Sequence, residues 1–300
     1  MLLFVCLSFF FNTFVLIMNI DGSTPYTLNV GGQLLTLDRP LVMGILNATS
    51  ESFYEASRTS SVDSIVHRAQ MMMDEGASIL DIGGCSTKPG LAPVSEDEEM
   101  RRLAMALDAI RSRFPEAILS VDTFRASVAQ RCVADYGVQI INDVYGGQAD
   151  GQMFDAVARL QVPYILTYDG PPSKLMYSIA ERIERLHLMG VNDIIVDPGF
   201  GFGKTLDENY YLMAHLEELH LLDCPLLVGV SRKSMIYKQL DCTPDEALNG
   251  TTALHTVALM KGAYILRVHD VKAAVEAVRI VEKLKSSTLN TKPYTLNSKH

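Results

Sequence analysis

The segment ILSVDTFRASVAQRCVADYGVQIIND, residues 118–143, decides the fold of this chain. It opens with an apolar run of strand length, Ile118–Val121, and closes with a second one, Val138–Ile141. Between these runs, Arg125–Tyr136 has the apolar spacing that is typical of one face of a helix. The order strand, helix, strand predicts two parallel strands that are covered by the helix connecting them.

The same alternation extends along the chain in both directions. Apolar runs of strand length recur at Leu41–Leu46, Ser78–Ile82, Ile118–Val121, Val138–Ile141, Tyr164–Leu166, Ile194–Val196, Leu226–Val228 and Ala263–Val268. Helical spacing separates most of them, at Met100–Ile110, Arg125–Tyr136, Leu206–Leu222, Asp245–Met260 and Val271–Leu284. Eight such units predict an α/β fold that closes into a (β/α)8 TIM barrel, with a doubly wound parallel sheet as the alternative.

Four segments are expected along the chain. Residues 1–17 form an apolar extension, 18–37 an N-terminal β-hairpin, 38–285 the barrel and 286–300 a polar tail. Gly31-Gly32 between two β-prone runs predicts the hairpin. The extension is long enough to span a membrane. It lacks the basic start of a signal peptide, since the first Lys or Arg is Arg39, and no A-x-A site follows it. We expect translation to start at Met18 and the protein to have no membrane partner. The alternative is that residues 1–17 anchor the protein in a membrane.

Composition excludes several classes of protein. Of the 300 residues, 48% are apolar and 20% charged, which suffices for a large core and excludes global disorder. The formal charge of −9, with no basic block, argues against a nucleic-acid partner and leaves small molecules as ligands. The five cysteines are odd in number and show no CxxC spacing, which favours the reducing cytoplasm over a disulfide framework or a zinc site.

Polar side chains follow the predicted strands at their C-terminal ends, where barrel enzymes carry their active sites. These exits are Asn47, Asp81, Asp122, Asn142, Asp143, Thr167 to Asp169, Asp197, Ser231 to Ser234, Arg267, His269 and Asp270. Asp122, Asn142 and Asp197 can bind the donor edge of a flat nitrogen heterocycle. The cations Lys233 and Arg267, with Lys88 or His269, suit a phosphorylated group. We therefore expect carboxylates at one end of the site and cations at the other.

At these positions the chain resembles the dihydropteroate synthases. The similar blocks are VMGILN (42–47), GASILDIGG (76–84), SVDT (120–123), IINDV (140–144), DPGFGFGKT (197–205), VGVSRKS (228–234), NGT (249–251) and RVHDV (267–271). They follow the family's order from residue 26 to residue 285. The resemblance implies a TIM barrel that condenses p-aminobenzoate with 6-hydroxymethyl-7,8-dihydropterin pyrophosphate, giving 7,8-dihydropteroate and pyrophosphate in folate biosynthesis.

The resemblance also implies roles for individual residues. Asp122, Asn142, Asp197 and Lys233 would bind the pterin, and Asp122, Lys233 and Arg267 would be catalytic. The pyrophosphate would be bound by Asn47, Thr87, Lys88, Arg267 and His269, with Mg²⁺ as cofactor and Asn47 as its ligand. Phe202 and Ser234 would bind p-aminobenzoate. The implied mechanism is dissociative, with Asp122 stabilising a pterin-methyl cation, and the implied assembly is a homodimer.

Three departures from the family pattern stand out. Thr49-Ser-Glu-Ser-Phe53 replaces Thr-Pro-Asp-Ser-Phe, and Cys85-Ser-Thr-Lys-Pro-Gly90 replaces Glu-Ser-Thr-Arg-Pro-Gly. Thr167-Tyr168 stands where a Met-His pair is common, and the short stretch from there to Gly190 predicts a curtailed fifth helix. Two alternative functions follow: a non-catalytic pterin-binding paralogue, or a corrinoid-dependent methyltetrahydrofolate methyltransferase.

Overall fold

The computed structural model describes residues 25–48, 58–85 and 92–289. Its first elements are the antiparallel strands β1 (Tyr26–Val30) and β2 (Gln33–Leu37). Gly31 and Gly32 join these strands with φ angles of 61° and 85°. Positive φ at both central residues is what a type I′ hairpin turn requires, and glycine adopts it without steric cost. The predicted hairpin is confirmed.

Eight parallel strands form the body of the protein. They are β3 (Leu41–Asn47), β4 (Ile79–Gly83), β5 (Leu119–Asp122), β6 (Ile140–Asp143), β7 (Tyr164–Thr167), β8 (Ile194–Asp197), β9 (Leu227–Val228) and β10 (Ile265–Val268). They pair in the order β8-β7-β6-β5-β4-β3-β10-β9. A parallel bridge between Val196 and Leu226 connects the two ends of this sheet. The closure confirms the TIM barrel and excludes the doubly wound sheet.

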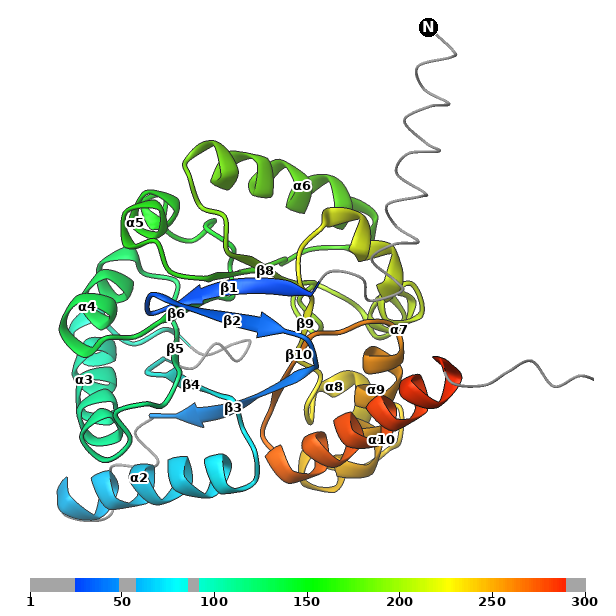
Figure 1. Ribbon diagram of the computed structural model, residues 1–300, viewed down its shortest axis with the longest axis horizontal. Coiled ribbons are helices and arrows are strands. Elements are labelled where there is room, and N and C mark those ends of the chain that lie inside the picture. Colours follow the sequence, from blue (N-terminus) through cyan, green and yellow to red (C-terminus); the bar gives the residue numbers. More distant parts are fainter. Residues whose placement is uncertain (1–24, 49–57, 86–91, 290–300) are drawn as a thin grey trace, which may run out of the picture.

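Helices surround the barrel, as Figure 1 shows. They are α2 (Arg58–Asp74), α3 (Glu96–Arg113), α4 (Ala126–Tyr136), α5 (Met153–Leu160), α6 (Pro172–Leu188), α7 (Leu206–Ala214), α8 (Ser234–Tyr237), α9 (Leu248–Met260) and α10 (Val271–Leu289), with 3₁₀ helices η2 (Leu216–Leu222) and η3 (Pro244–Glu246). In residues 118–143, α4 is followed by Gly137 as its C-cap residue, with a left-handed φ of 62°. The chain then turns directly into β6.

The hairpin closes the N-terminal mouth of the barrel. Leu28, Val30 and Leu37 are buried in one apolar cluster with side chains from the starts of the barrel strands. The strand residues in this cluster include Leu41, Met43, Ile79, Ile140, Ile165, Ile195, Leu227 and Ile265. Figure 1 shows the hairpin lying across the barrel opening. Among the described residues, the hairpin therefore covers the N-terminal end of the barrel, and the C-terminal ends of the strands remain as the end that can carry a site.

Two helical predictions were wrong. The helix after the fifth barrel strand is not curtailed, because α6 has 17 residues. Helix α6 begins at Pro172, directly after Pro171 and soon after β7 ends at Thr167. The helix expected over Leu206–Leu222 breaks at His215 into α7 and η2. The last helix continues to Leu289, past the expected start of the polar tail at residue 286.

Within the described part of the chain, no helix has the length and apolar character needed to cross a membrane. The apolar extension and Met18 lie outside the described residues, as do Thr49 to Phe53, Thr87 and Lys88.

The buried hairpin generates a stability prediction. Leu28 is 1% exposed, whereas Leu34 in the same hairpin is 76% exposed. We expect Leu28→Ala to lower the free energy of unfolding by about 2–5 kcal/mol, because it leaves a cavity in the sealed mouth. Leu34→Ala should change it by less than about 0.5 kcal/mol. Denaturant unfolding measures both, and equal effects would contradict the packing described here.

Candidate active site

A buried ion-pair cluster lies where strands β4, β5 and β10 end. The Arg267 guanidinium donates from Nε to Oδ2 of Asp81 and from Nη2 to Oδ2 of Asp122, each at 2.6 Å. The side chain of Asp81 is fully buried, and that of Asp122 is 9% exposed. The fork of one arginine thus binds carboxylates from two neighbouring strands.

Asn142 extends this cluster to the next strand. Its Nδ2 donates to the same Oδ2 of Asp81 at 2.9 Å, so one carboxylate oxygen accepts from both an arginine and an amide. The second oxygens, Oδ1 of Asp81 and Oδ1 of Asp122, are buried with no hydrogen-bond partner among the described residues. Buried acceptors in proteins are nearly always satisfied, so these two atoms are suited to the N–H donors of a ligand.

The electrostatics of this cluster follow from its burial. Burial raises the pKa of Asp122 to about 7, although Arg267 acts to lower it and Asp81 to raise it further. Burial also acts to lower the pKa of Arg267, but Asp81 and Asp122 outweigh it and the net direction is upward. Arg267 therefore keeps its positive charge. Asp122 gains and loses its proton near neutral pH, because burial disfavours the ionised carboxylate.

The expected separation of carboxylates from cations is wrong. Arg267 lies among the carboxylates at the end of the barrel, not at an opposite cationic end. Burial and Arg267 together lower the pKa of His269 to about 4, so His269 is neutral at neutral pH. An anion would be received there by a hydrogen-bonding imidazole beside an arginine that carries the charge.

Lys233 and Asp197 add a second pair of opposite charges to this end of the barrel. Lys233 Nζ donates to the Phe200 carbonyl, and it lies 4.6 Å from the centroid of the Phe202 ring. Burial lowers the pKa of Lys233 to about 8, and Asp197 acts against this. Burial raises the pKa of Asp197, and Lys233 opposes that shift. The two residues, on β8 and on the loop after β9, thus carry opposite charges that stabilise one another electrostatically.

The loop that carries Phe202 is held by Lys204, a residue to which we assigned no role from the sequence. Lys204 Nζ donates to the carbonyls of Tyr168, Gly199 and Phe202 at 3.2, 2.9 and 3.0 Å. Gly199 has a φ of 71°, and a Cβ there would lie 1.9 Å from the Tyr168 carbonyl oxygen. Only glycine fits this approach, which fixes the position of the Phe202 ring against Lys233.

The structure brings most of the predicted site residues to one end of the barrel. Asp122, Asn142, Asp197, Lys233, Arg267 and His269 lie at or just after strand ends. Asn47 ends β3 with an exposed side chain, and Ser234 begins α8 directly after Lys233. Sequence reasoning noted Asp81 as a strand exit but gave it no binding role. A pairing with Arg267 cannot be seen in the sequence because the two residues lie far apart along the chain.

A parallel barrel whose C-terminal mouth buries carboxylates, an amide and cations defines an enzyme that binds a polar heterocycle. Comparison with known proteins agrees, since residues 43–269 match the family of pterin binding enzymes. The dihydropteroate synthase of Escherichia coli is 41% identical over 275 residues, covering 86% of this chain and 96% of that one. That of Bacillus subtilis is 39% identical over 260 residues, covering 82% and 89%.

A solved structure shows the same likeness in three dimensions. The dihydropteroate synthase from Xanthomonas albilineans in complex with 7,8-dihydropteroate has a TM-score of 0.78 and 35% identity, covering 87% of this chain and 99% of that one. The chain belongs to the pterin binding enzymes. Within them it belongs with the dihydropteroate synthases, which are transferases of folate biosynthesis.

The lowered pKa of Lys233 generates a pH prediction. Lys233 carries its charge below about pH 8 and loses it above that value. We expect a pterin ligand to bind progressively more weakly as the pH rises through 8, because the ammonium donor is lost. Calorimetry across this pH range measures the change. Lys233→Arg keeps its charge throughout, so its affinity should not fall over the same range; a parallel fall in both proteins would contradict the assignment.

Proposed function

We propose that this chain condenses 6-hydroxymethyl-7,8-dihydropterin pyrophosphate with p-aminobenzoate, releasing 7,8-dihydropteroate and pyrophosphate. The observation that carries the proposal is the buried Asp122, which pairs through one oxygen with Arg267 and has no hydrogen-bond partner on the other among the described residues. Such a carboxylate can accept from a heterocycle and face a positive charge that develops on it. The relatedness to dihydropteroate synthases supplies the reaction.

The pterin would bind between the carboxylates and Lys233. Its amino and ring N–H groups are donors that match the open oxygen of Asp122 and the carboxylate of Asp197. Asn142 offers an amide oxygen, since its Nδ2 is already used by Asp81. Lys233 would donate to the pterin carbonyl. The contact to Asp122 would give a partner to a buried oxygen that has none among the described residues.

The pyrophosphate would lie toward Asn47, Arg267 and His269. Arg267 supplies the charge, and neutral His269 and the Asn47 amide supply hydrogen bonds. Thr87 and Lys88, which the family resemblance adds to this group, belong to residues 86–91 outside the described part. The p-aminobenzoate ring would pack on Phe202, with its carboxylate near Ser234.

Magnesium fits this donor set only together with the substrate. Among the described residues, no cluster of three His, Cys, Asp or Glu side chains could hold a metal ion. Mg²⁺ in such sites takes most of its ligands from phosphate oxygens and water, so the single amide oxygen of Asn47 suffices on the protein side. Mg²⁺ bound there would neutralise charge on the pyrophosphate.

The reaction would proceed by loss of pyrophosphate before the new bond forms. Arg267 and His269 bind the leaving group as its bond to the pterin methylene carbon breaks. The ionised carboxylate of Asp122 stabilises the resulting pterin-methyl cation. The amine of p-aminobenzoate then attacks that carbon and loses a proton. No side chain forms a covalent bond in this scheme.

The alternative functions have less support. A corrinoid-dependent methyltransferase would need no leaving-group site, whereas Arg267 and His269 lie together at the end of β10. A non-catalytic paralogue was suggested by the altered loops and by a curtailed fifth helix, and α6 is of full length. Turnover that depends on p-aminobenzoate would exclude both.

We also propose a cytoplasmic homodimer. Cys132, Cys224 and Cys242 form no disulfide, in keeping with a reducing compartment. Exposed apolar side chains on the neighbouring helices α9 and α10, namely Val257, Met260, Ile280 and Leu284, offer a surface for a second copy. Light scattering should give twice the mass of the chain.

The role of Asp122 is tested by Asp122→Asn, which keeps the shape and removes the charge. We expect turnover to fall about 10²–10³-fold, because one preorganised electrostatic partner of the cation is lost. Arg267 then keeps only Asp81 as a charged partner, so thermal unfolding is measured beside turnover to separate a catalytic loss from a loss of stability. Turnover within threefold of wild type in a pyrophosphate-release assay would refute the role.

The role of Arg267 is tested by Arg267→Ala. We expect the affinity for inorganic pyrophosphate to fall at least about 10-fold. Stability should also fall, because Asp81 and Asp122 would remain as buried charges without their partner. Calorimetry at a temperature where the variant is folded separates the two effects. Unchanged pyrophosphate affinity would place that subsite elsewhere.

A further inference from the structure

Two neighbouring loops carry groups for different substrates in the proposed reaction. The loop after β9, Ser231 to Ser234, carries Lys233 for the pterin and Ser234 for p-aminobenzoate. The end of β10 carries Arg267 and His269 for the pyrophosphate. The strands β9 and β10 are paired, so the two loops leave the barrel side by side. Their relative position decides whether the pterin and its leaving group are bound in one productive geometry.

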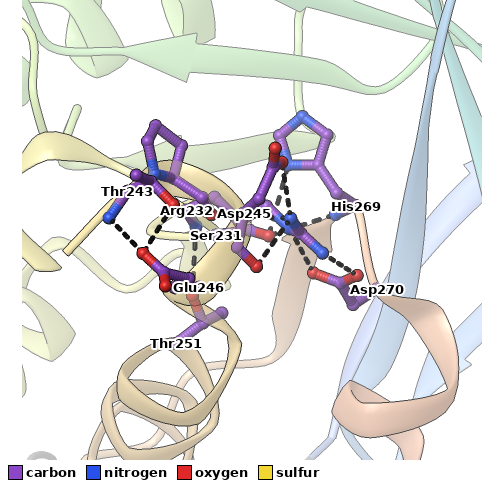
Figure 2. A network of polar contacts seen from close by, with 9 residues as sticks. Ser231, Arg232, Thr243, Asp245, Glu246, Thr251, His269 and Asp270 are labelled. Carbon is purple, nitrogen blue, oxygen red and sulfur yellow. Dashed lines mark hydrogen bonds and ion pairs between the residues drawn. The ribbon is translucent and has the colours of Figure 1, made fainter. Parts of the chain in front are cut away.

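A bidentate ion pair connects these loops. Arg232 donates from Nε to Oδ2 of Asp270 and from Nη2 to Oδ1 of Asp270, both at 2.8 Å (Figure 2). Arg232 directly precedes Lys233, and Asp270 directly follows His269. Both side chains are only about one quarter exposed, at 26% and 24%. Two parallel hydrogen bonds between planar groups fix both distance and orientation, unlike a single ionic contact.

The backbone of Arg232 is also fixed. Its φ of 54° is left-handed, which is uncommon for a residue with a side chain and has an energetic cost. Its N–H donates to Oγ1 of Thr251, a buried residue of α9, at 3.1 Å. The left-handed turn lets Arg232 reach Asp270 while the following Lys233 reaches the Phe200 carbonyl inside the site.

A second contact joins the same two loops. The backbone N–H of His269 donates to Oγ of Ser231 at 3.2 Å, and Nδ1 of His269 lies 3.2 Å from the same oxygen. Figure 2 shows Ser231 and His269 beside the Arg232–Asp270 pair. The loops are thus connected at two successive positions, Ser231 to His269 and Arg232 to Asp270.

We propose that Arg232 and Asp270 are positioning residues, which hold the pterin side of the site in register with the pyrophosphate side. The proposal rests on the function proposed above. Neither residue touches a reacting atom; each acts through its neighbour, Lys233 or His269. Loss of the pair lets the two loops move apart, and displacements of about 1 Å at a reacting centre can cost about 100-fold in rate.

Asp245 provides a matched control, because it contacts the same Arg232 guanidinium. Arg232 Nη1 also contacts Oδ1 of Asp245 at 3.2 Å, but the Asp245 side chain is 98% exposed. Exposed ion pairs contribute little, and Asp245 belongs to η3, not to either ligand-binding loop. Asp245→Asn therefore removes a carboxylate charge near Arg232 without disconnecting the loops.

The experiment compares Asp270→Asn, Arg232→Gly, their double variant and Asp245→Asn in the full chain. Asparagine serves as well as aspartate before a helix, and glycine adopts the positive φ without strain, so backbone effects stay small. Calorimetry measures affinity for inorganic pyrophosphate and, separately, for 6-hydroxymethyl-7,8-dihydropterin. Steady-state assays give kcat and KM, and thermal unfolding shows that each variant is folded.

We expect Asp270→Asn and Arg232→Gly each to lower kcat/KM about 10- to 100-fold and to weaken both ligands. The double variant should be no worse than the poorer single variant, because the two residues act as one unit. Asp245→Asn should remain within twofold of wild type. The proposal is overturned if Asp270→Asn behaves like Asp245→Asn, or if only one of the two ligands is weakened. Absence of turnover in wild type would instead refute the proposed function, while the binding measurements would still test the pair.

Discussion

The burial of one guanidinium between two carboxylates organises the active end of this barrel. Arg267 can stay charged away from water only because Asp81 and Asp122 surround it, and each carboxylate can stay buried only because Arg267 pairs with it. The second oxygen of each carboxylate is buried and has no hydrogen-bond partner among the described residues. In the proposed function, the N–H donors of the ligand would supply these missing partners.

The rest of the site is built to hold charges in fixed places. Lys204 donates to the Phe202 loop and to the Tyr168 carbonyl after β7, and Arg232 donates with two nitrogens to Asp270 after β10. Each of these basic side chains connects segments that follow different strands. They therefore differ from the cations proposed to bind the ligand, because their hydrogen bonds fix the loops. Sequence alone does not distinguish these groups, because both lie within the same motifs.

The barrel, the hairpin and the site end could be predicted because each rests on local pattern. Strand length, helical spacing and a Gly-Gly turn are properties of neighbouring residues, and polar exits follow directly from strand ends. The pairing of Arg267 with Asp81 could not be predicted, since it depends on the register of β10, β3 and β4. The break at His215 and the full length of α6 also escaped prediction, because packing sets helix ends more than residue spacing does.

The hairpin at the closed mouth also has a consequence for the order of folding. Leu28, Val30 and Leu37 are made before any barrel strand, yet they pack against Leu227 and Ile265 near the end of the chain. Until β10 has left the ribosome, the barrel surface against which these apolar side chains pack is incomplete, so they stay exposed to water. The nascent chain therefore carries an exposed, strand-forming segment throughout synthesis, the kind of segment that chaperones bind and that aggregates when they do not.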